Sequence, residues 1–205
     1  MNKKLRLLVT TKCPNKCPMC CNNSWDFSSL PVVDRWNYEE IMITGGEPLI
    51  HTNKVAELIR SIQVISEVYT DIPKVYVYTS IAAWDRVRTI LAYADGIVLT
   101  PHSQSDIDKF VELNNMMQEV KETKSDFIKG KSLRLNLFAD MKLLLPEHID
   151  LSLWNVKEMK WLENCPVPQG EDFRRIKELS TVSAPYSDKI SGLSMVSQKS
   201  SSFLK

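Results

Sequence analysis

Short hydrophobic runs alternate with stretches of helical periodicity over the first 140 residues of the chain. Runs rich in Leu, Ile, Val and Tyr predict strands at 5–10, 41–44, 75–79, 96–100 and 133–138. Between them, apolar positions three and four apart predict three helices. The first has Thr52 or Asn53 as its N-cap, the second begins near residue 82, and the third opens at a capping box that starts with Ser105. Strands that alternate with helices in this way are typical of βαβ units and a parallel sheet.

The length limits how far this alternation can go. A closed eight-unit barrel needs roughly 250 residues, or about thirty per unit, and this chain has 205. We therefore expect an α/β fold with a parallel sheet, a partial, open (β/α) barrel of about five to six βα units, within a domain over 1–180. The Ser-rich segment 181–205 has no periodicity and is expected to be a partly disordered tail.

Charge and hydropathy exclude several classes of function. The chain has 26 Lys and Arg against 25 Asp and Glu, a net charge of +1, which gives no signal for nucleic-acid binding. No apolar run approaches the about 18 residues of a membrane span, and the apolar part of the N-terminal segment is too short for a secretion signal. We expect a cytoplasmic protein without a membrane partner.

The cysteines carry the strongest chemical signal. Four of the five fall within nine positions, which favours metal or cluster binding in a reducing compartment over a disulfide framework. Cys13, Cys17 and Cys20 have the spacing C-x3-C-x2-C directly after the first strand. Three ligands leave one coordination position open, as catalysis requires, although a structural zinc site is the alternative. Cys21 and Cys165 are expected to be bystander thiols.

Two motifs together resemble the radical S-adenosylmethionine (radical SAM) superfamily. The first is Cys13-Pro-Asn-Lys-Cys17-Pro-Met-Cys20, and the second, 25 residues later, is Gly45-Gly46-Glu47-Pro48 at the end of the second strand. The resemblance covers about residues 5–140 and also implies a partial barrel. Met19 stands where the family usually has an aromatic residue, and the chain has no second cysteine cluster that would hold an auxiliary centre.

The resemblance implies a cofactor set and roles for these residues. Cys13, Cys17 and Cys20 would hold a 4Fe–4S cluster whose fourth iron binds S-adenosylmethionine. Reductive cleavage of that cofactor would give a 5′-deoxyadenosyl radical that abstracts hydrogen from the substrate, with flavodoxin or ferredoxin as the reductant protein. Gly45 and Gly46 would let the backbone approach the methionyl group, so Gly46→Val is expected to leave the fold nearly intact while weakening cofactor binding.

Further contacts to the cofactor are expected at the ends of later strands, because active sites of barrels gather at the carboxyl ends of their strands. The candidates for binding its ribose and carboxylate, besides Glu47 and Pro48 of the second motif, are Ser80, Ser103 or His102, Arg134 and Asn136. Arg134 alternates with Leu133 and Leu135 and therefore lies on the sheet face opposite theirs. Whether that face is the inside of the barrel is open.

Several functions are compatible with these motifs. Within the superfamily, the spacing slightly favours an activase that installs a glycyl radical on a partner protein, and the alternative is a small-molecule enzyme similar to those of deazapurine synthesis. From other classes, the alternatives are a non-catalytic zinc or iron–sulfur interaction module and an electron-transfer protein, which would need a fourth ligand. The sequence does not name the substrate.

Overall fold

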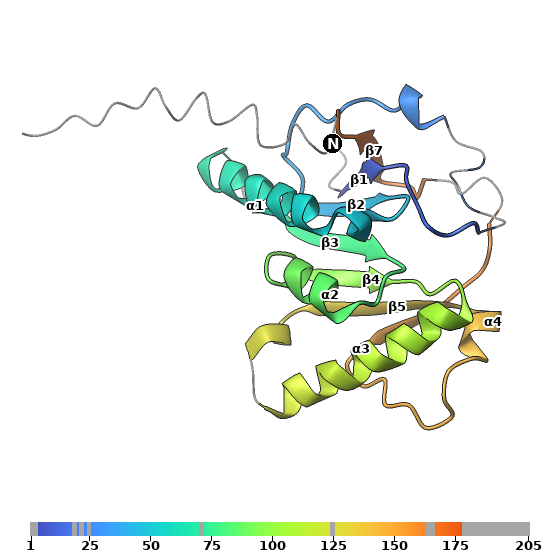
Figure 1. Cartoon of the computed structure of the whole chain (residues 1–205). Coiled ribbons are helices and arrows are strands. Elements are labelled where there is room, and N and C mark those ends of the chain that lie inside the picture. Colours follow the sequence, from blue (N-terminus) through green and yellow to red (C-terminus); the bar gives the residue numbers. More distant parts are fainter. Residues whose placement is uncertain are drawn as a thin grey trace, which may run out of the picture.

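A seven-stranded, all-parallel sheet forms the centre of the protein, with the strand order β6-β5-β4-β3-β2-β1-β7 (Figure 1). The computed structural model describes residues 4–17, 20, 23, 26–69, 72–123, 126–162 and 167–177. The strands are β1 (Lys4–Thr10), β2 (Glu40–Gly45), β3 (Lys74–Thr79), β4 (Gly96–Leu99), β5 (Ser132–Phe138), β6 (Asn155–Met159) and β7 (Glu171–Arg175). Because β6 and β7 form opposite edges, the sheet is open, which confirms the predicted fold class.

Four of the strands are each followed by an α-helix in the part of the chain that the structure describes. These are α1 (Thr52–Tyr69), α2 (Trp84–Leu91), α3 (Gln104–Glu122) and α4 (Ala139–Lys142), after β2, β3, β4 and β5. Short 3-10 helices occur at η2 (Phe27–Ser29), η3 (Pro48–His51) and η4 (Asp126–Ile128). The connection from β1 to β2 contains the cysteine motif, and its described residues form η2 but no α-helix.

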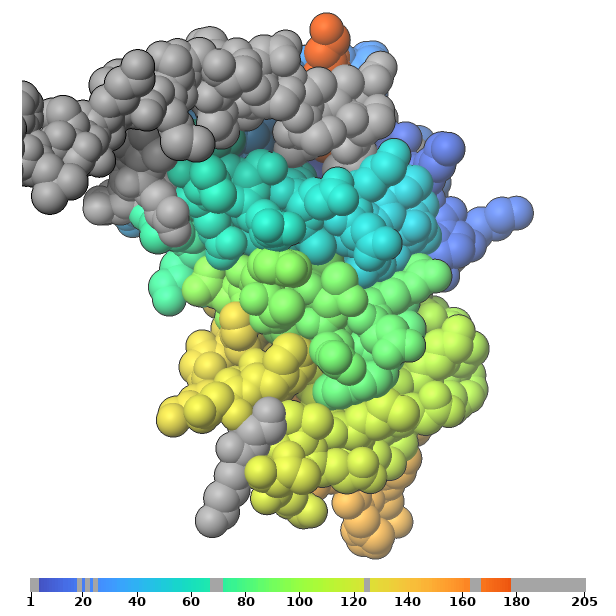
Figure 2. Space-filling model, turned by 60° about the vertical axis from the view of Figure 1, so that its left-hand side comes forward, coloured from blue at the N-terminus to red at the C-terminus, as the bar shows by residue number. Residues whose placement is uncertain are grey.

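The main core lies between the helices and one face of the sheet. Strand residues such as Leu7, Ile43 and Val77 are fully buried there, in one cluster with residues of α1, α2 and α3. These three helices lie one below the other over that face (Figure 2). Because side chains alternate along a strand, Arg6, Met42, Tyr76, Tyr78, Val98 and Arg134 lie on the other face. We call this second face the inner face.

Two predicted helix caps are wrong. Thr52 already has helical backbone angles and continues directly from η3, so neither Thr52 nor Asn53 caps α1. In α3 the cap is Ser103 instead of Ser105, because its hydroxyl oxygen accepts a 3.2 Å hydrogen bond from the backbone N–H of Asp106. The side chain of Asp106 in turn accepts from the backbone N–H of His102, at 3.0 Å.

The two edge strands were not predicted. β6 is largely exposed and β7 only half-buried, so neither has the hydrophobic pattern of a buried strand. β7 pairs in parallel with β1 at the far edge from β6. The predicted tail 181–205 lies outside the described residues. No helix in the described part of the chain is both long and apolar enough to cross a membrane.

Candidate cofactor site

A cavity of about 180 Å³ at the carboxyl ends of the strands brings the two sequence motifs together. Its wall includes Cys13, Cys17 and Cys20 after β1, Gly45–Glu47 at the end of β2, Thr79 and Ser80 at the end of β3, and Thr100 and His102 after β4. The carboxyl ends of parallel strands meet at one edge of a sheet, which is where ligand sites of such folds occur. We call this cavity the cysteine cavity.

A tight turn sets the positions of two of the three thiols. The backbone N–H of Cys20 donates to the carbonyl of Cys17 at 3.1 Å, and the side-chain amide of Asn23 donates to the same carbonyl at 3.3 Å. This three-residue spacing, closed by its hydrogen bond, places the Cys17 and Cys20 side chains near each other. All three cysteines of the motif are half-buried thiols.

The surroundings of the thiols favour their protonated form. Burial raises the pKa of Cys17 to about 11, and the neighbouring Cys20 and Cys13 contribute to that rise. Burial is also the main cause of the raised pKa of Cys13. A metal or cluster binds the thiolate, so binding would release protons from this site.

The donor set fits an iron–sulfur cluster, although the thiols are not arranged as a finished ligand set. Three cysteines on one cavity wall supply the soft ligands that such clusters use. Within the described residues, no group of three or more His, Cys, Asp or Glu side chains is placed to hold a metal ion. Cys21 and Cys165 lie outside those residues. The fit therefore rests on the identity of the donors and their shared cavity.

The two glycines of the second motif allow two backbone segments to approach closely. A Cβ atom at Gly45 would lie 2.2 Å from the carbonyl oxygen of Thr10, and one at Gly46 would lie 2.2 Å from that of Lys12. Gly45 also has φ +146°, a backbone conformation that favours glycine. The N–H groups of Gly46 and Glu47 donate to the Thr10 and Lys12 carbonyls at 2.6 and 2.8 Å.

This contact corrects one expectation. The space beside the Gly46 α-carbon is filled by the backbone that leads into Cys13, and so is not available to a methionyl group. The expectation that Gly46→Val would leave the fold nearly intact is therefore wrong, because a side chain there would displace the cysteine loop.

Glu47 links the ends of two strands to the cysteine loop. It is 1% exposed, and its Oε1 accepts from the Leu49 N–H at 3.0 Å and from the Thr79 hydroxyl at 2.6 Å. Its Oε2 accepts from both the N–H and the hydroxyl of Ser80, each at 2.8 Å. The Ser80 hydroxyl then accepts from the side-chain amide of Asn15 at 3.0 Å, and Asn15 lies between Cys13 and Cys17.

This network predicts a specific effect of Glu47→Gln. A glutamine has only one acceptor oxygen, and its NH₂ group would face either the Ser80 or the Leu49 backbone N–H, which cannot accept. A buried donor without a partner costs about 1–3 kcal/mol, so we expect a loss of about 2 kcal/mol in the free energy of unfolding. Urea denaturation measures it.

The matched control is Glu57→Gln, which makes the same change on the exposed side of α1. Surface substitutions of this kind change stability by less than about 0.5 kcal/mol. Equal stability of the two variants would mean that the four hydrogen bonds of Glu47 do not stabilise the fold.

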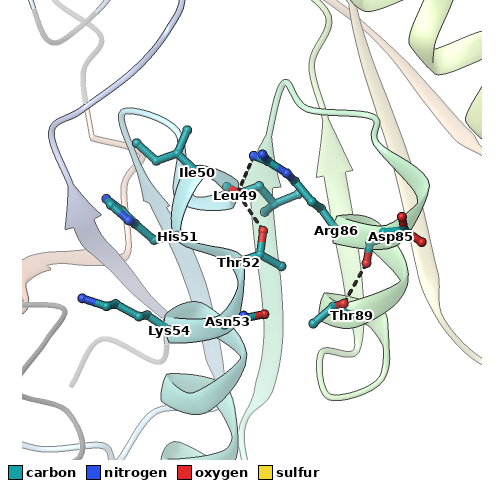
Figure 3. A pocket seen from close by; sticks show the side chains of 9 residues that line it. All are labelled: Leu49, Ile50, His51, Thr52, Asn53, Lys54, Asp85, Arg86 and Thr89. Atoms are coloured by element: carbon teal, nitrogen blue, oxygen red, sulfur yellow. Dashed lines mark hydrogen bonds between the residues drawn. The ribbon is translucent and has the colours of Figure 1, made fainter.

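A second set of contacts holds the glycine motif, residues 45–48, in place through residues of η3, α1 and α2. These residues surround a cavity of about 410 Å³ (Figure 3). The carbonyl of Leu49 accepts from Nη1 of Arg86 at 2.9 Å and from the hydroxyl of Thr52 at 2.7 Å. The backbone N–H of Leu49 therefore donates to Glu47, while its carbonyl accepts from one residue of α1 and one of α2. These bonds position η3, and with it the loop that contains Glu47.

A larger cavity of about 570 Å³ adjoins the cysteine cavity. Asn15, Cys17, His102 and Trp161 line both cavities. Trp161 stacks on Phe138 with ring centroids 3.9 Å apart and planes 3° apart, and the His102 ring lies 5.9 Å from Trp161. The shared wall is therefore aromatic, with polar groups of Ser103 and Asp140 on the side of the larger cavity.

His102 has an unsatisfied polar atom in this wall. Its Nδ1 is buried and has no hydrogen-bond partner in the described part of the chain. Burial lowers the pKa of His102, so the ring is neutral at pH 7 and can either donate or accept a hydrogen bond. A buried polar atom without a partner is costly, and its position between the two cavities indicates a place for a polar ligand group.

The structure brings together most of the residues expected at the site. Ser80 reaches the cysteine cavity but uses its hydroxyl within the Glu47 network, and Ser103 lines the larger cavity while capping α3. Asn136 lies beside the cysteine cavity, where its amide donates to the Thr100 hydroxyl at 3.5 Å. Pro48 is buried in η3. Arg134 lines neither cavity.

Three residues of the site were not among the predicted contacts. Asn15 was given no role beyond its place in the cysteine motif, and Ser80 was selected instead of its neighbour Thr79. Trp161 follows a strand that was not predicted. The sequence contained a signal for Asn15 and Thr79. Both are polar residues at or just after the carboxyl end of a predicted strand, and these ends meet at the edge of the sheet where active sites form.

Comparison with family models finds no match to this sequence, and none of the curated proteins matches it either. Inference about function therefore depends on the site itself.

Proposed function

We propose that this protein is a radical SAM enzyme that cleaves S-adenosylmethionine at a 4Fe–4S cluster and abstracts hydrogen from a substrate. The observation that supports it best is the shared cavity of Cys13, Cys17 and Cys20 with the glycine motif, at the carboxyl ends of an open parallel sheet. The cysteines alone would equally suit a structural zinc site. Their convergence with the glycine motif on one cavity is what an active site of this class requires.

In this proposal the thiolates of Cys13, Cys17 and Cys20 would hold the cluster and leave one coordination position for the cofactor. When bound, a 4Fe–4S cluster would supply one electron, received from a reductant protein such as flavodoxin or ferredoxin, for the cleavage of S-adenosylmethionine to methionine and a 5′-deoxyadenosyl radical. Abstraction of a hydrogen atom from the substrate would then give 5′-deoxyadenosine and a substrate radical.

The remaining residues of the site bind, orient and exclude water. The Glu47–Ser80–Asn15 network holds the cysteine loop against the ends of β2 and β3. Rigid positioning of this kind is the contribution a protein makes when the cofactor supplies the reactive chemistry.

The adjoining cavity suits the adenosyl part of the cofactor. Its volume of about 570 Å³ is in the usual range for small-molecule sites. Trp161 offers an aromatic surface beside His102, whose buried Nδ1 has no partner among the described residues. A nucleoside would cover the aromatic surface and supply that hydrogen bond.

The test is formation of 5′-deoxyadenosine. After anaerobic reconstitution with iron and sulfide and reduction with dithionite, the protein is expected to convert S-adenosylmethionine slowly to 5′-deoxyadenosine and methionine without added substrate. Liquid chromatography with mass spectrometry measures both products, which must form in equal amounts.

The zinc-loaded protein is the matched control, because zinc occupies thiolates but transfers no electron. It is expected to give no product. If the protein binds zinc, takes up no stable cluster and forms no 5′-deoxyadenosine, then it is a non-catalytic metal-binding module and the proposal is wrong.

A further inference from the structure

Arg134 lies on the inner face with part of its guanidinium unused. Its Nε donates to the Ser132 hydroxyl at 3.0 Å, and the guanidinium lies over the Tyr76 ring, 4.6 Å from the ring centroid. Within the described residues, its two terminal nitrogens make no hydrogen bond and no carboxylate forms an ion pair with it. Two adjacent N–H groups at the end of a guanidinium form the fork that binds a carboxylate or phosphate.

Two other positive charges of this face are neutralised. Arg6 pairs with Glu171 at 2.7 Å, and Lys4 pairs with Glu40 at 3.0 Å. Among the described residues no ion pair forms with Arg134 or with the exposed Lys157, which lies beside Asn136 on the same face. Both charges are therefore uncompensated. The face is therefore complementary to an anion.

The fold presents this guanidinium toward the centre of the sheet. Gly96 of β4 lies between Tyr76 and Ser132 in the strand register, so no side chain stands between these two residues in that row. The pKa of Lys4 is raised, first by its hydrogen bond with Glu40, while the charge of Arg134 acts to lower it.

The inner face is continuous with the cysteine cavity. Tyr78 lines that cavity and shares a register row with Val98 and Arg134. The next position of β5 on the same face is Asn136, which contacts Thr100 of the cavity wall. Two residues of a strand span about 7 Å, so the Arg134 position lies one row of side chains from the cavity.

We propose that the inner face binds a small substrate with an oxyanion group, a carboxylate or a phosphate, and that Arg134 is the residue that binds this group. The remainder of the substrate lies over Tyr78 and extends to the cysteine cavity, where a hydrogen atom is taken. This inference rests on the proposed function for the identity of the reaction, but the anion site follows from Arg134 and its neighbours. It favours a small-molecule substrate over a glycine of a partner protein.

The experiment uses fluorinated probes and the purified full chain. Binding of 4-fluorobenzoate, 4-fluorophenyl phosphate and the neutral 4-fluorobenzamide is measured by fluorine NMR titration. Both anions are expected to bind saturably and the benzamide at least about tenfold more weakly, since a charge-assisted, two-point hydrogen bond distinguishes them. The anion that binds more tightly identifies the group.

Two substitutions test the residue. Arg134→Gln is expected to weaken anion binding about tenfold, and Arg134→Lys, which keeps the charge but not the fork, by a smaller factor of about three. The matched control is Arg60→Gln, because Arg60 also lies over a tyrosine, Tyr93, at 5.6 Å, but on an exposed part of α1. This control is expected to bind both anions as the natural sequence does.

Equal binding of benzoate and benzamide, or unchanged anion binding in both Arg134 variants, would overturn the inference. The titration needs neither S-adenosylmethionine nor a reductant. Anion binding without 5′-deoxyadenosine formation would therefore contradict only the proposed function, and the reverse result would contradict only the anion site.

Discussion

Replacement of any one of Cys13, Cys17 or Cys20 by alanine is expected to remove most of the iron and sulfide from the reconstituted protein and to abolish 5′-deoxyadenosine formation. A cubane held by three thiolates becomes exposed at one edge when only two remain. Iron and sulfide assays and product analysis measure the two effects.

Cys21→Ala and Cys165→Ala are the controls. Cys21 directly follows Cys20 and Cys165 lies in a distant segment, so both variants are expected to keep a full cluster, with a stability cost of about 1–2 kcal/mol if the thiols are buried. Loss of the cluster in Cys165→Ala together with its retention in Cys20→Ala would show that the ligand assignment is wrong.

Gly46→Ala is expected to destabilise the fold by about 3–5 kcal/mol and to lower cluster uptake at the same time. The added Cβ would lie 2.2, 2.6 and 2.8 Å from backbone atoms of Lys12 and Thr11, and backbone cannot move aside as a side-chain tip can. Overpacking that shifts backbone costs several kcal/mol, and the shifted segment leads into Cys13. Urea denaturation and iron analysis measure both changes.

The control for this substitution is Gly130→Ala. A Cβ added at Gly130 would have no atom within 4 Å, but the residue has φ +72°, so this variant carries only the about 1–2 kcal/mol cost of a left-handed alanine. Cluster uptake is expected to be unchanged in that variant. If Gly46→Ala unfolds no more easily than Gly130→Ala, the close approach at Gly46 is not a structural requirement.

The periodicity of the sequence predicted the central part of the fold. The strands at 5–10, 41–44, 75–79, 96–100 and 133–138 are all present within a residue or two, because a strand with a buried face shows an apolar run or an apolar alternation that can be recognised locally. The edge strands β6 and β7 lack a buried apolar pattern of this kind. Their pairing with β5 and β1 depends on where distant segments lie, so local pattern could not reveal them.

For the candidate site, residue identity and spacing were sufficient to select the cysteines and the glycine motif. They could not show how Glu47 is used, since its four hydrogen bonds come from η3 and the end of β3. They placed Arg134 among the cofactor contacts, whereas the structure places it on the inner face over Tyr76. Alternation indicated the face opposite Leu133 and Leu135 but not what else lies on that face.

The sequence by itself thus determined the parallel α/β core and the presence of a three-thiol loop before a glycine-rich turn, because these features depend on residues close together in the chain. Only the tertiary structure decided which residues share a cavity, which backbone segment occupies the space beside Gly46, and that the guanidinium of Arg134 lies over Tyr76 without an ion pair among the described residues. The physical reason is that packing, hydrogen-bond satisfaction and ion pairing join residues from strands far apart in sequence, and each is settled only when those strands meet in one sheet.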